Sequence, residues 1–250
     1  MNWHIANPNT GQAMSDLLVT TLTHRFPALD IEVTTSPCGP ASLEGHADEA
    51  LAVPGLLTRI IEAEHHHPGC RGHVIACFGD PGIAAAREVA RRPVIGMAEA
   101  AMASARLIGE RFSIITTLAR TVPLARRLVR EYGHAQHCGG IHASGINVLD
   151  LDSDSAFQRV LEDSEQLLSA DQSDVLILGC AGMAPWAPGL QERLGRPVVD
   201  GVSAGLQLLV HLDQLDLSPA KQHDRALPID KPVIGPHSHL YARLHEDTRS

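Results

Sequence analysis

The chain has 250 residues and a net charge of −9 at pH 7; 44% of its residues are hydrophobic and only 3% are aromatic. This length suits one large α/β domain or two small ones with an aliphatic core. The negative charge argues against general affinity for nucleic acids or anionic membranes, and no apolar run approaches the roughly 18 residues of a membrane helix.

The first half of the chain alternates strand-like apolar segments with helical patterns. Strands are expected at residues 3–6, 31–35, 73–77 and 93–96. Helices are expected at residues 12–26, 47–64, 83–91 and 99–107, with Pro54 as a candidate kink. The run of histidines at residues 65–67 is interpreted as an extended loop. No carboxylate or cysteine stands near it at a ligand spacing, so no metal site is predicted there.

The second half repeats this alternation. Strands are expected at residues 111–115, 140–144, 175–178 and 197–200, and helices at residues 123–132, 156–170 and 203–215. Residues 218–250 do not fit the pattern, because prolines interrupt them repeatedly. We interpret them as an irregular C-terminal arm, packed on the body or on a neighbouring subunit, and assign no function to them.

Corresponding features recur at a nearly constant spacing. Cys180 follows Cys77 by 103 positions, and the strand at 197 follows the one at 93 by 104. Such a repeat of strand–helix units predicts two pseudo-symmetric α/β lobes, each with a parallel sheet covered by helices on both faces. Because ligands bind at the carboxyl ends of parallel strands, we expect one cleft between the lobes to collect Asn7, Cys77, Thr116 and Cys180.

The five cysteines are odd in number, widely spaced and without a CxxC pair, so neither a disulfide framework nor a structural zinc site is expected. Asn7, Asn9 and Asp16 stand where a signal peptide would have its apolar core, which predicts a cytoplasmic protein. Cys77 and Cys180 differ from the others, because each ends an apolar strand and precedes a glycine-containing loop. A helix N-terminus and backbone amides beside such a thiol are expected to lower its pKa towards 7.

Two symmetric thiols favour acid–base chemistry over nucleophilic catalysis, because neither loop supplies a histidine. A racemase removes a proton on one face of a carbon and returns one on the other, through an enolate that needs hydrogen-bond donors. Catalytic roles are therefore predicted for Cys77 and Cys180. The candidate donors are backbone amides after each thiol and polar side chains at other strand ends: Phe78, Gly79, Ala181, Gly182, Asn7, Asn9, Thr116 and Thr117.

Six segments together resemble the hydantoin racemase family, which belongs to the aspartate/glutamate racemase superfamily and has allantoin racemases as close relatives. They are residues 7–10 (NPNT), 39–45 (GPASLEG), 77–82 (CFGDPG), 93–96 (PVIG), 179–183 (GCAGM) and 197–202 (PVVDGV). The resemblance implies racemisation at C5 of hydantoins without a cofactor or metal, with Cys77 and Cys180 as the two acid/base groups. It also implies that Leu43 binds substrate and that the protein is a homo-oligomer. The tail after Leu217 departs from the family pattern.

The resemblance further implies flavodoxin-like lobes, with the chain crossing back at the end of the second. We therefore place lobe 1 at residues 1–97 plus 206–217, lobe 2 at 98–205 and the arm at 218–250. The four loops among these segments, residues 7–10, 39–45, 77–82 and 179–183, contain no Arg or Lys, so a charged amino-acid carboxylate would lack a side-chain clamp. This favours a hydantoin or allantoin as the small-molecule substrate over aspartate or glutamate.

Three other readings stay open at this point. Another activity of the superfamily, of the amino-acid racemase or maleate isomerase type, would use similar residues. Residues 201–205 (GVSAG) match a nucleophile elbow, so a serine hydrolase using Ser203 with Asp213 and His237 is an alternative. A two-lobed binding protein without catalytic function is the third.

Overall fold

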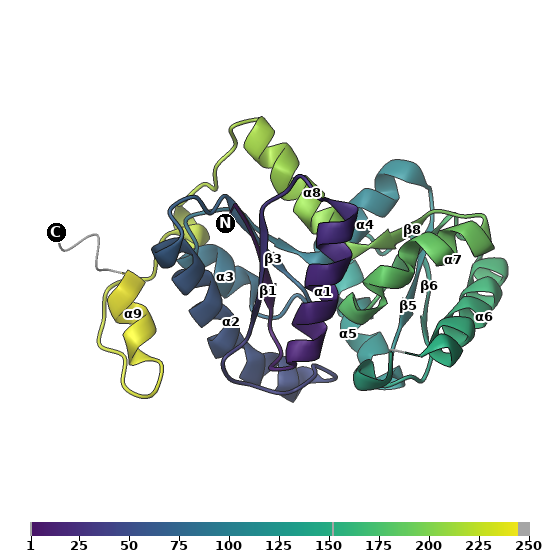
Figure 1. Cartoon of the computed structure of the whole chain (residues 1–250), viewed down its shortest axis with the longest axis horizontal. Helices are drawn as coiled ribbons and strands as arrows, with labels where there is room; N and C mark the ends of the chain where they lie inside the picture. The colour runs from purple at the N-terminus through teal and green to yellow at the C-terminus, as the bar shows by residue number, and fades with distance from the viewer. Residues whose placement is uncertain (1, 152, 245–250) are drawn as a thin grey trace.

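Within residues 2–151 and 153–244, which the structure describes, a computed structural model shows two four-stranded parallel sheets (Figure 1). The first sheet has the order β2-β1-β3-β4 and the second β6-β5-β7-β8. The strands are β1 (Trp3–Asn7), β2 (Ile31–Thr35), β3 (Gly72–Ile75), β4 (Val94–Gly96), β5 (Phe112–Thr116), β6 (Cys138–Ala143), β7 (Val175–Leu178) and β8 (Val198–Asp200). The identical order confirms the predicted repeat, and it is the order of the first four flavodoxin strands.

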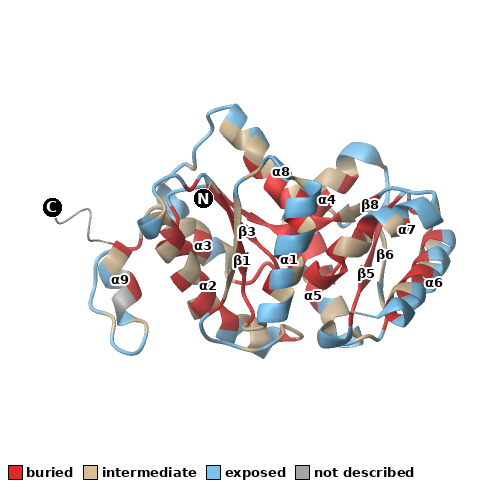
Figure 2. Cartoon of the chain, in the orientation of Figure 1, coloured by how far each residue is buried: buried red, intermediate tan, exposed pale blue. Residues whose placement is uncertain are grey.

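Helices cover both faces of each sheet and leave the buried residues in the middle layers, while the outer faces of α1 and α6 are exposed (Figure 2). The helices are α1 (Gln12–Arg25), α2 (His46–His66), α3 (Ile83–Val89), α4 (Met97–Ile108), α5 (Val122–Glu131), α6 (Asp154–Asp171), α7 (Ala187–Leu194), α8 (Gly201–Gln214) and α9 (Ser238–Leu244). The core is aliphatic, as the composition predicts. The predicted fold class is therefore confirmed.

Helices α4 and α8 connect the two lobes. Helix α4 follows β4 of the first sheet but packs on β7 and β8 of the second, whereas α8 follows β8 and packs on β3 and β4. The two helices also pack on each other through small residues. At Gly201 an added Cβ would lie 2.1 Å from the carbonyl oxygen of Met97, so only glycine allows this approach. The lobe boundaries at residues 97, 205 and 217 stay predictions.

Two local features differ from the expectation. Residues 65 and 66 form the end of α2 rather than a loop, because the helix continues past residue 64 to His66. Pro54 stands inside α2, as expected, and the kink there stays a prediction. Helix α7 was not predicted at all, because Pro185, Pro188 and Gly189 weaken the helical pattern; Pro188 is nevertheless tolerated in the first turn, where its missing N–H has no partner to lose.

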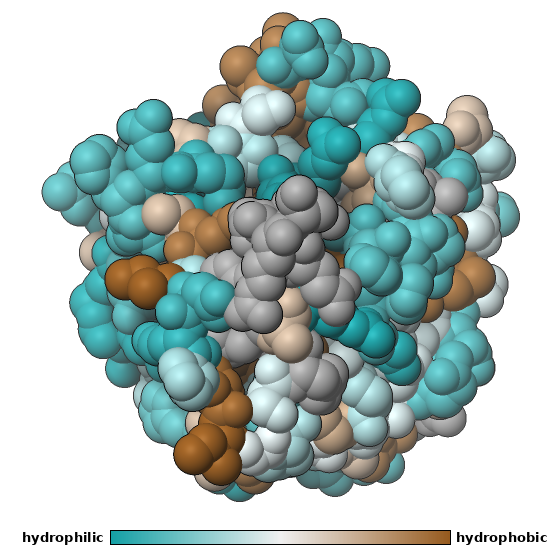
Figure 3. Space-filling model, turned by 90° about the vertical axis from the view of Figure 1, so that its left-hand side faces the viewer, coloured by the Kyte–Doolittle hydropathy of each residue, from teal (hydrophilic) through white to brown (hydrophobic). Residues whose placement is uncertain are grey.

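The C-terminal arm packs on the first lobe and is not wholly irregular. Its Lys221 donates hydrogen bonds to the carbonyl oxygens of Glu88 and Ala90 near the end of α3, at 2.6 and 2.8 Å. Helix α9 buries Leu240 and Leu244 against α2 and α3. Viewed onto this end, the surface is mostly hydrophilic, with hydrophobic residues in separate places (Figure 3). Residues 245–250 of the predicted arm lie outside the described part.

A buried polar chain crosses the first sheet away from the strand ends that carry the thiols. His4 meets His73 with 2.9 Å between their Nδ1 atoms, and His73 meets Glu64 at 3.0 Å. Burial lowers the pKa of His4, so its ring accepts from the His73 Nδ1–H. Burial opposes protonation of His73 too, but hydrogen bonds to Cys70 and Glu64 raise its pKa to about 9. The ion pair of His73 with Glu64, extended by the hydrogen bond to His4, satisfies the polar groups of the two histidines that are buried in this sheet.

Candidate active site

The carboxyl ends of the central strands face one another across the two lobes. Asn7 ends β1 and Thr116 ends β5, while Cys77 and Cys180 each stand two residues beyond β3 and β7. In both sheets these are the neighbouring middle strands. This is the switch point at which flavodoxin-like sheets bind ligands. The repeat thus supplies one thiol and one polar strand end from each lobe.

Nine of the eleven predicted site residues line one cavity in the described part of the chain. They are Asn9, Leu43, Cys77, Phe78, Gly79, Thr116, Thr117, Cys180 and Ala181. Asn7 and Gly182 do not line it. Gly182 donates its backbone N–H to the sulfur of Cys180. The geometry therefore separates residues that face the cavity from residues that hold them.

Asn7 is one of the supporting residues. It is buried, and its Nδ2 group donates to Asn9 Oδ1 and to Ser15 Oγ, both at 3.0 Å. Asn9 Oδ1 also accepts from the N–H of Gly11 at 2.9 Å. These bonds occupy the oxygen of the Asn9 amide and leave its NH₂ group to donate into the cavity. Asn7 thus fixes the side chain of Asn9, which lines the cavity.

The thiols do not have the lowered pKa values expected from the sequence. Burial raises the pKa of Cys77 to about 12 and that of Cys180 to about 11, although the N–H groups of Gly79 and Gly182 donate to the two sulfurs and oppose this shift. The negative charge of a Cys180 thiolate raises the pKa of Cys77 further, so the two groups are electrostatically coupled. With these pKa values both thiols are protonated at neutral pH.

Asp80 holds the loop after Cys77 in place. Its carboxylate accepts hydrogen bonds from the N–H groups of Ala98 and Glu99 at the start of α4, at 3.1 and 3.0 Å, and from the hydroxyl of Tyr132, directly after α5, at 2.8 Å. An added Cβ at Gly96 would lie 2.3 Å from this carboxyl, so the contact requires glycine. Burial raises the pKa of Asp80 to about 6. One side chain thus ties the first thiol loop to two helices.

Sequence reasoning missed eight cavity residues, because helix faces rather than motifs carry most of them. They are Met14, Glu49, Ala76, Thr121, Leu124, Ala125, Val148 and Gly179. Most are small or apolar. Glu49 is the one charged residue lining the cavity in the described part of the chain. In the sequence, the feature that could have indicated Glu49 is its position in the first turn of the helix that follows the 39–45 segment.

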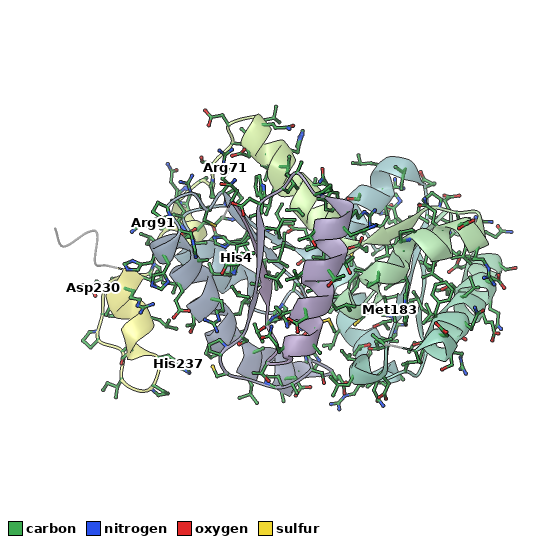
Figure 4. All side chains as sticks on the ribbon, in the orientation of Figure 1. His4, Arg71, Arg91, Met183, Asp230 and His237 are labelled. Atoms are coloured by element: carbon green, nitrogen blue, oxygen red, sulfur yellow. The ribbon has the colours of Figure 1, made fainter. Side chains whose placement is uncertain are left out.

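The serine hydrolase reading is wrong. Ser203 is buried in the first turn of α8, where its N–H is capped by Asp200 at 2.8 Å. Asp213 stands ten residues further along the same helix, about 15 Å away, and pairs with Arg71 at 2.6 Å. Met183 belongs to the turn after Cys180, which packs against α8, the helix of Ser203. His237 lies in the C-terminal arm, far from Met183 (Figure 4). These three residues cannot form a triad.

Residues 2–151 and 153–244 contain neither a candidate metal site nor a membrane-spanning helix. No group of three or more His, Cys, Asp or Glu side chains there could hold a metal ion. His67 instead meets Glu32 at 3.4 Å. No helix in these ranges is long and apolar enough to span a bilayer.

The family model described as Asp/Glu/Hydantoin racemase matches residues 4–209, which include both thiols and every cavity residue. The chain belongs to the Asp/Glu/hydantoin racemase family. A hydantoin racemase of Rhizobium meliloti is 39% identical over 94% of this chain and 98% of its own length. An allantoin racemase structure from Klebsiella pneumoniae is 41% identical, with a TM-score of 0.90 over 96% of this chain and 98% of that one.

Membership of this family confirms the predicted enzyme class, a racemase and therefore an isomerase. The racemase fold extends to more distant structures: a glutamate racemase from Bacillus anthracis, only 16% identical, has a TM-score of 0.62 over 86% of this chain and 82% of that one. A non-catalytic two-lobed binding protein is no longer a competing reading.

Proposed function

We propose that this chain is a cofactor-independent racemase that inverts C5 of 5-substituted hydantoins, with allantoin as a second candidate substrate. The observation that carries the proposal is the pair of thiols on equivalent loops, lining one cavity from opposite lobes. The names of the relatives, hydantoin racemase and allantoin racemase, support the substrate class. We further expect a homo-oligomer, as the sequence resemblance implies.

The reaction needs one thiolate and one thiol. The thiolate takes the proton from C5, and the C–H electron pair moves into the C4 carbonyl to form an enolate. The thiol on the other face then gives its proton to C5, and the enolate electrons return to that bond. The reverse reaction exchanges the two roles, so each thiol serves one enantiomer. Cys77 and Cys180 are the only thiols lining the described cavity.

Hydrogen-bond donors stabilise the enolate oxygen. The amides of Gly79 and Gly182 are directed at the sulfurs and favour the thiolates. The amides of Phe78 and Ala181 stand one residue closer to the thiols, and Ala181 is the first residue of its helical turn, whose N–H has no partner within the turn. Together with the Asn9 NH₂ group and the Thr117 hydroxyl, these amides can meet the ring oxygens.

The charge of the cavity favours a neutral ring. No Arg or Lys lines it in the described part of the chain, and its one charged residue is acidic. Negative charge on Glu49 and Asp80 already raises the pKa of Cys77. A substrate that carries its own carboxylate would meet this field without a cationic clamp. A hydantoin, which is neutral and offers both N–H and C=O groups, avoids that repulsion.

The proposal is tested by the decay of circular dichroism from single enantiomers. Pure enantiomers of 5-methylhydantoin, 5-benzylhydantoin, allantoin and aspartate are each incubated with the protein. We expect decay to zero for at least one hydantoin and none for aspartate. Decay of aspartate alone would replace the proposal with the amino-acid racemase alternative.

We expect the reaction to accelerate with pH. Burial raises both thiol pKa values, to about 12 and about 11, so only a small fraction of the protein carries the required thiolate at pH 7. Below the first ionisation of the coupled pair, kcat/KM should rise about tenfold per pH unit between pH 7 and 9, after subtraction of uncatalysed racemisation. A flat profile over this range would contradict the raised thiol pKa values.

A further inference from the structure

Glu49 lines the cavity and carries a carboxylate oxygen that has no hydrogen-bond partner within the described residues. This oxygen, Oε1, is buried, while Oε2 meets Arg127 Nη2 at 3.4 Å and His46 Nδ1 at 3.7 Å. The side chain as a whole is only 12% exposed. A buried acceptor without a donor is costly, and folded proteins rarely leave one in that state. A ligand that brings a donor would remove this cost.

Glu49 Oε1 lies close to the loop that carries the Cys77 thiol. An added Cβ at Gly79 would lie 2.4 Å from Glu49 Oε1, so the carboxylate lies directly over the residue two positions after Cys77. Gly79 also donates its backbone N–H to the Cys77 sulfur. The charge of Glu49 acts on that sulfur as well. An atom bonded to a carbon that reacts with Cys77 would therefore come within reach of Glu49.

We propose that Glu49 is a substrate-binding residue whose Oε1 accepts a hydrogen bond from the N1–H group of the hydantoin ring. This inference rests on the proposed function and fixes how the ring is turned in the cavity. The carboxylate must stay away from the C4 oxygen, where negative charge develops in the enolate. N3–H is next to that oxygen, whereas N1–H lies on the other side of C5. N1–H is thus the donor that meets Glu49 without opposing the reaction.

The assignment also defines the substrate class more narrowly. The atom next to the reacting carbon must carry an N–H donor, and the substrate must not add negative charge near Glu49. Arg127, on α5 of the other lobe, pairs with Oε2 and so leaves Oε1 as the carboxylate oxygen available to a ligand donor. Hydantoins and allantoin meet both requirements, because both keep N1–H.

The test uses wild-type protein with 5-methylhydantoin and its N1-methyl and N3-methyl derivatives, together with Glu49→Gln and a control variant, Glu62→Gln. Glu62 belongs to the same helix and also pairs with arginines, but it does not line the cavity. For the wild type we expect N1-methylation to lower kcat/KM at least tenfold more than N3-methylation does, as the loss of a charge-assisted hydrogen bond requires. Glu49→Gln should raise KM for the parent compound about tenfold without lowering kcat, because loss of the Glu49 charge favours the Cys77 thiolate.

In Glu49→Gln the difference between the two methylated compounds should shrink to less than about threefold, and Glu62→Gln should behave as wild type. Equal effects of the two methyl groups on the wild type would overturn the assignment even if the variant fails to fold. A Glu49→Gln protein with unchanged KM would overturn it as well. If the wild type racemises 5-methylhydantoin but shows no N1 preference, only the role of Glu49 fails. If it racemises no hydantoin, the proposed function fails and the assignment with it.

Discussion

Replacing either cavity thiol, as Cys77→Ser or Cys180→Ser, should lower the rate of hydantoin racemisation by about 10² to 10⁴-fold, the usual contribution of one general acid or base. A serine hydroxyl fills a similar space but is far less acidic than a thiol, so it neither takes nor returns the C5 proton at a useful rate. The single variants should differ in one respect. Each variant keeps one working thiol and should therefore still exchange the C5 hydrogen of one enantiomer with solvent. The enantiomer that exchanges in Cys77→Ser should be the opposite of the one that exchanges in Cys180→Ser.

The matched control for this pair is Cys38→Ser. Cys38 is exposed and does not line the cavity, so this variant should keep the wild-type rate. Rates are measured by circular dichroism with each enantiomer, and exchange by proton NMR in D₂O. If Cys77→Ser or Cys180→Ser racemised at near wild-type rates, the two-thiol account would be wrong.

The largest expected effect on stability is that of Gly201→Ala at the contact between α4 and α8. The added methyl group would lie 2.1 Å from the oxygen and 2.8 Å from the carbonyl carbon of Met97, which are backbone atoms at the start of α4. Only a shift of one helix can relieve this clash. We expect the free energy of unfolding to fall by about 3 kcal/mol, the upper part of the range for overpacked sites. Urea denaturation followed by circular dichroism measures it.

Because α4 and α8 join the lobes, the same shift should also reduce racemisation in the protein that remains folded, by separating the thiol loops. Gly189→Ala is the control. Gly189 stands inside α7, and an added Cβ there would lie 3.5 Å from Phe157 of α6, an ordinary van der Waals contact. Alanine is the better helix former by roughly 1 kcal/mol. This variant should be as stable as wild type or slightly more stable. Equal stability of both variants would contradict the close packing at Gly201.

The sequence predicted the fold and most of the cavity because the relevant signals are local or repeated. The apolar runs before Cys77 and Cys180 mark buried parallel strands, and their recurrence predicts two equivalent lobes. The same strand order in both sheets confirms this repeat. Topology then brings strand ends together without any knowledge of side-chain contacts.

The remaining features depend on packing between distant segments, which no local pattern encodes. Glu49 reads as an ordinary charged residue in a helical first turn until α2 is placed beside the Cys77 loop. The thiol pKa values went the other way from the expectation, because burial by both lobes outweighs the backbone amides. Asn7 was predicted to bind substrate. It does not line the cavity, and its hydrogen bonds to Asn9 and Ser15 hold the Asn9 side chain in place.

The central claim, that two opposed thiols move two different protons, is tested most directly by early turnover of one pure hydantoin enantiomer in D₂O. The recovered substrate and the newly formed product are separated by chiral chromatography, and deuterium at C5 is measured in each by mass spectrometry. The account predicts deuterium in the product and almost none in the recovered substrate, because the second thiol supplies a solvent-derived deuteron to the opposite face. Equal deuterium in both, or original hydrogen retained in the product, would contradict it.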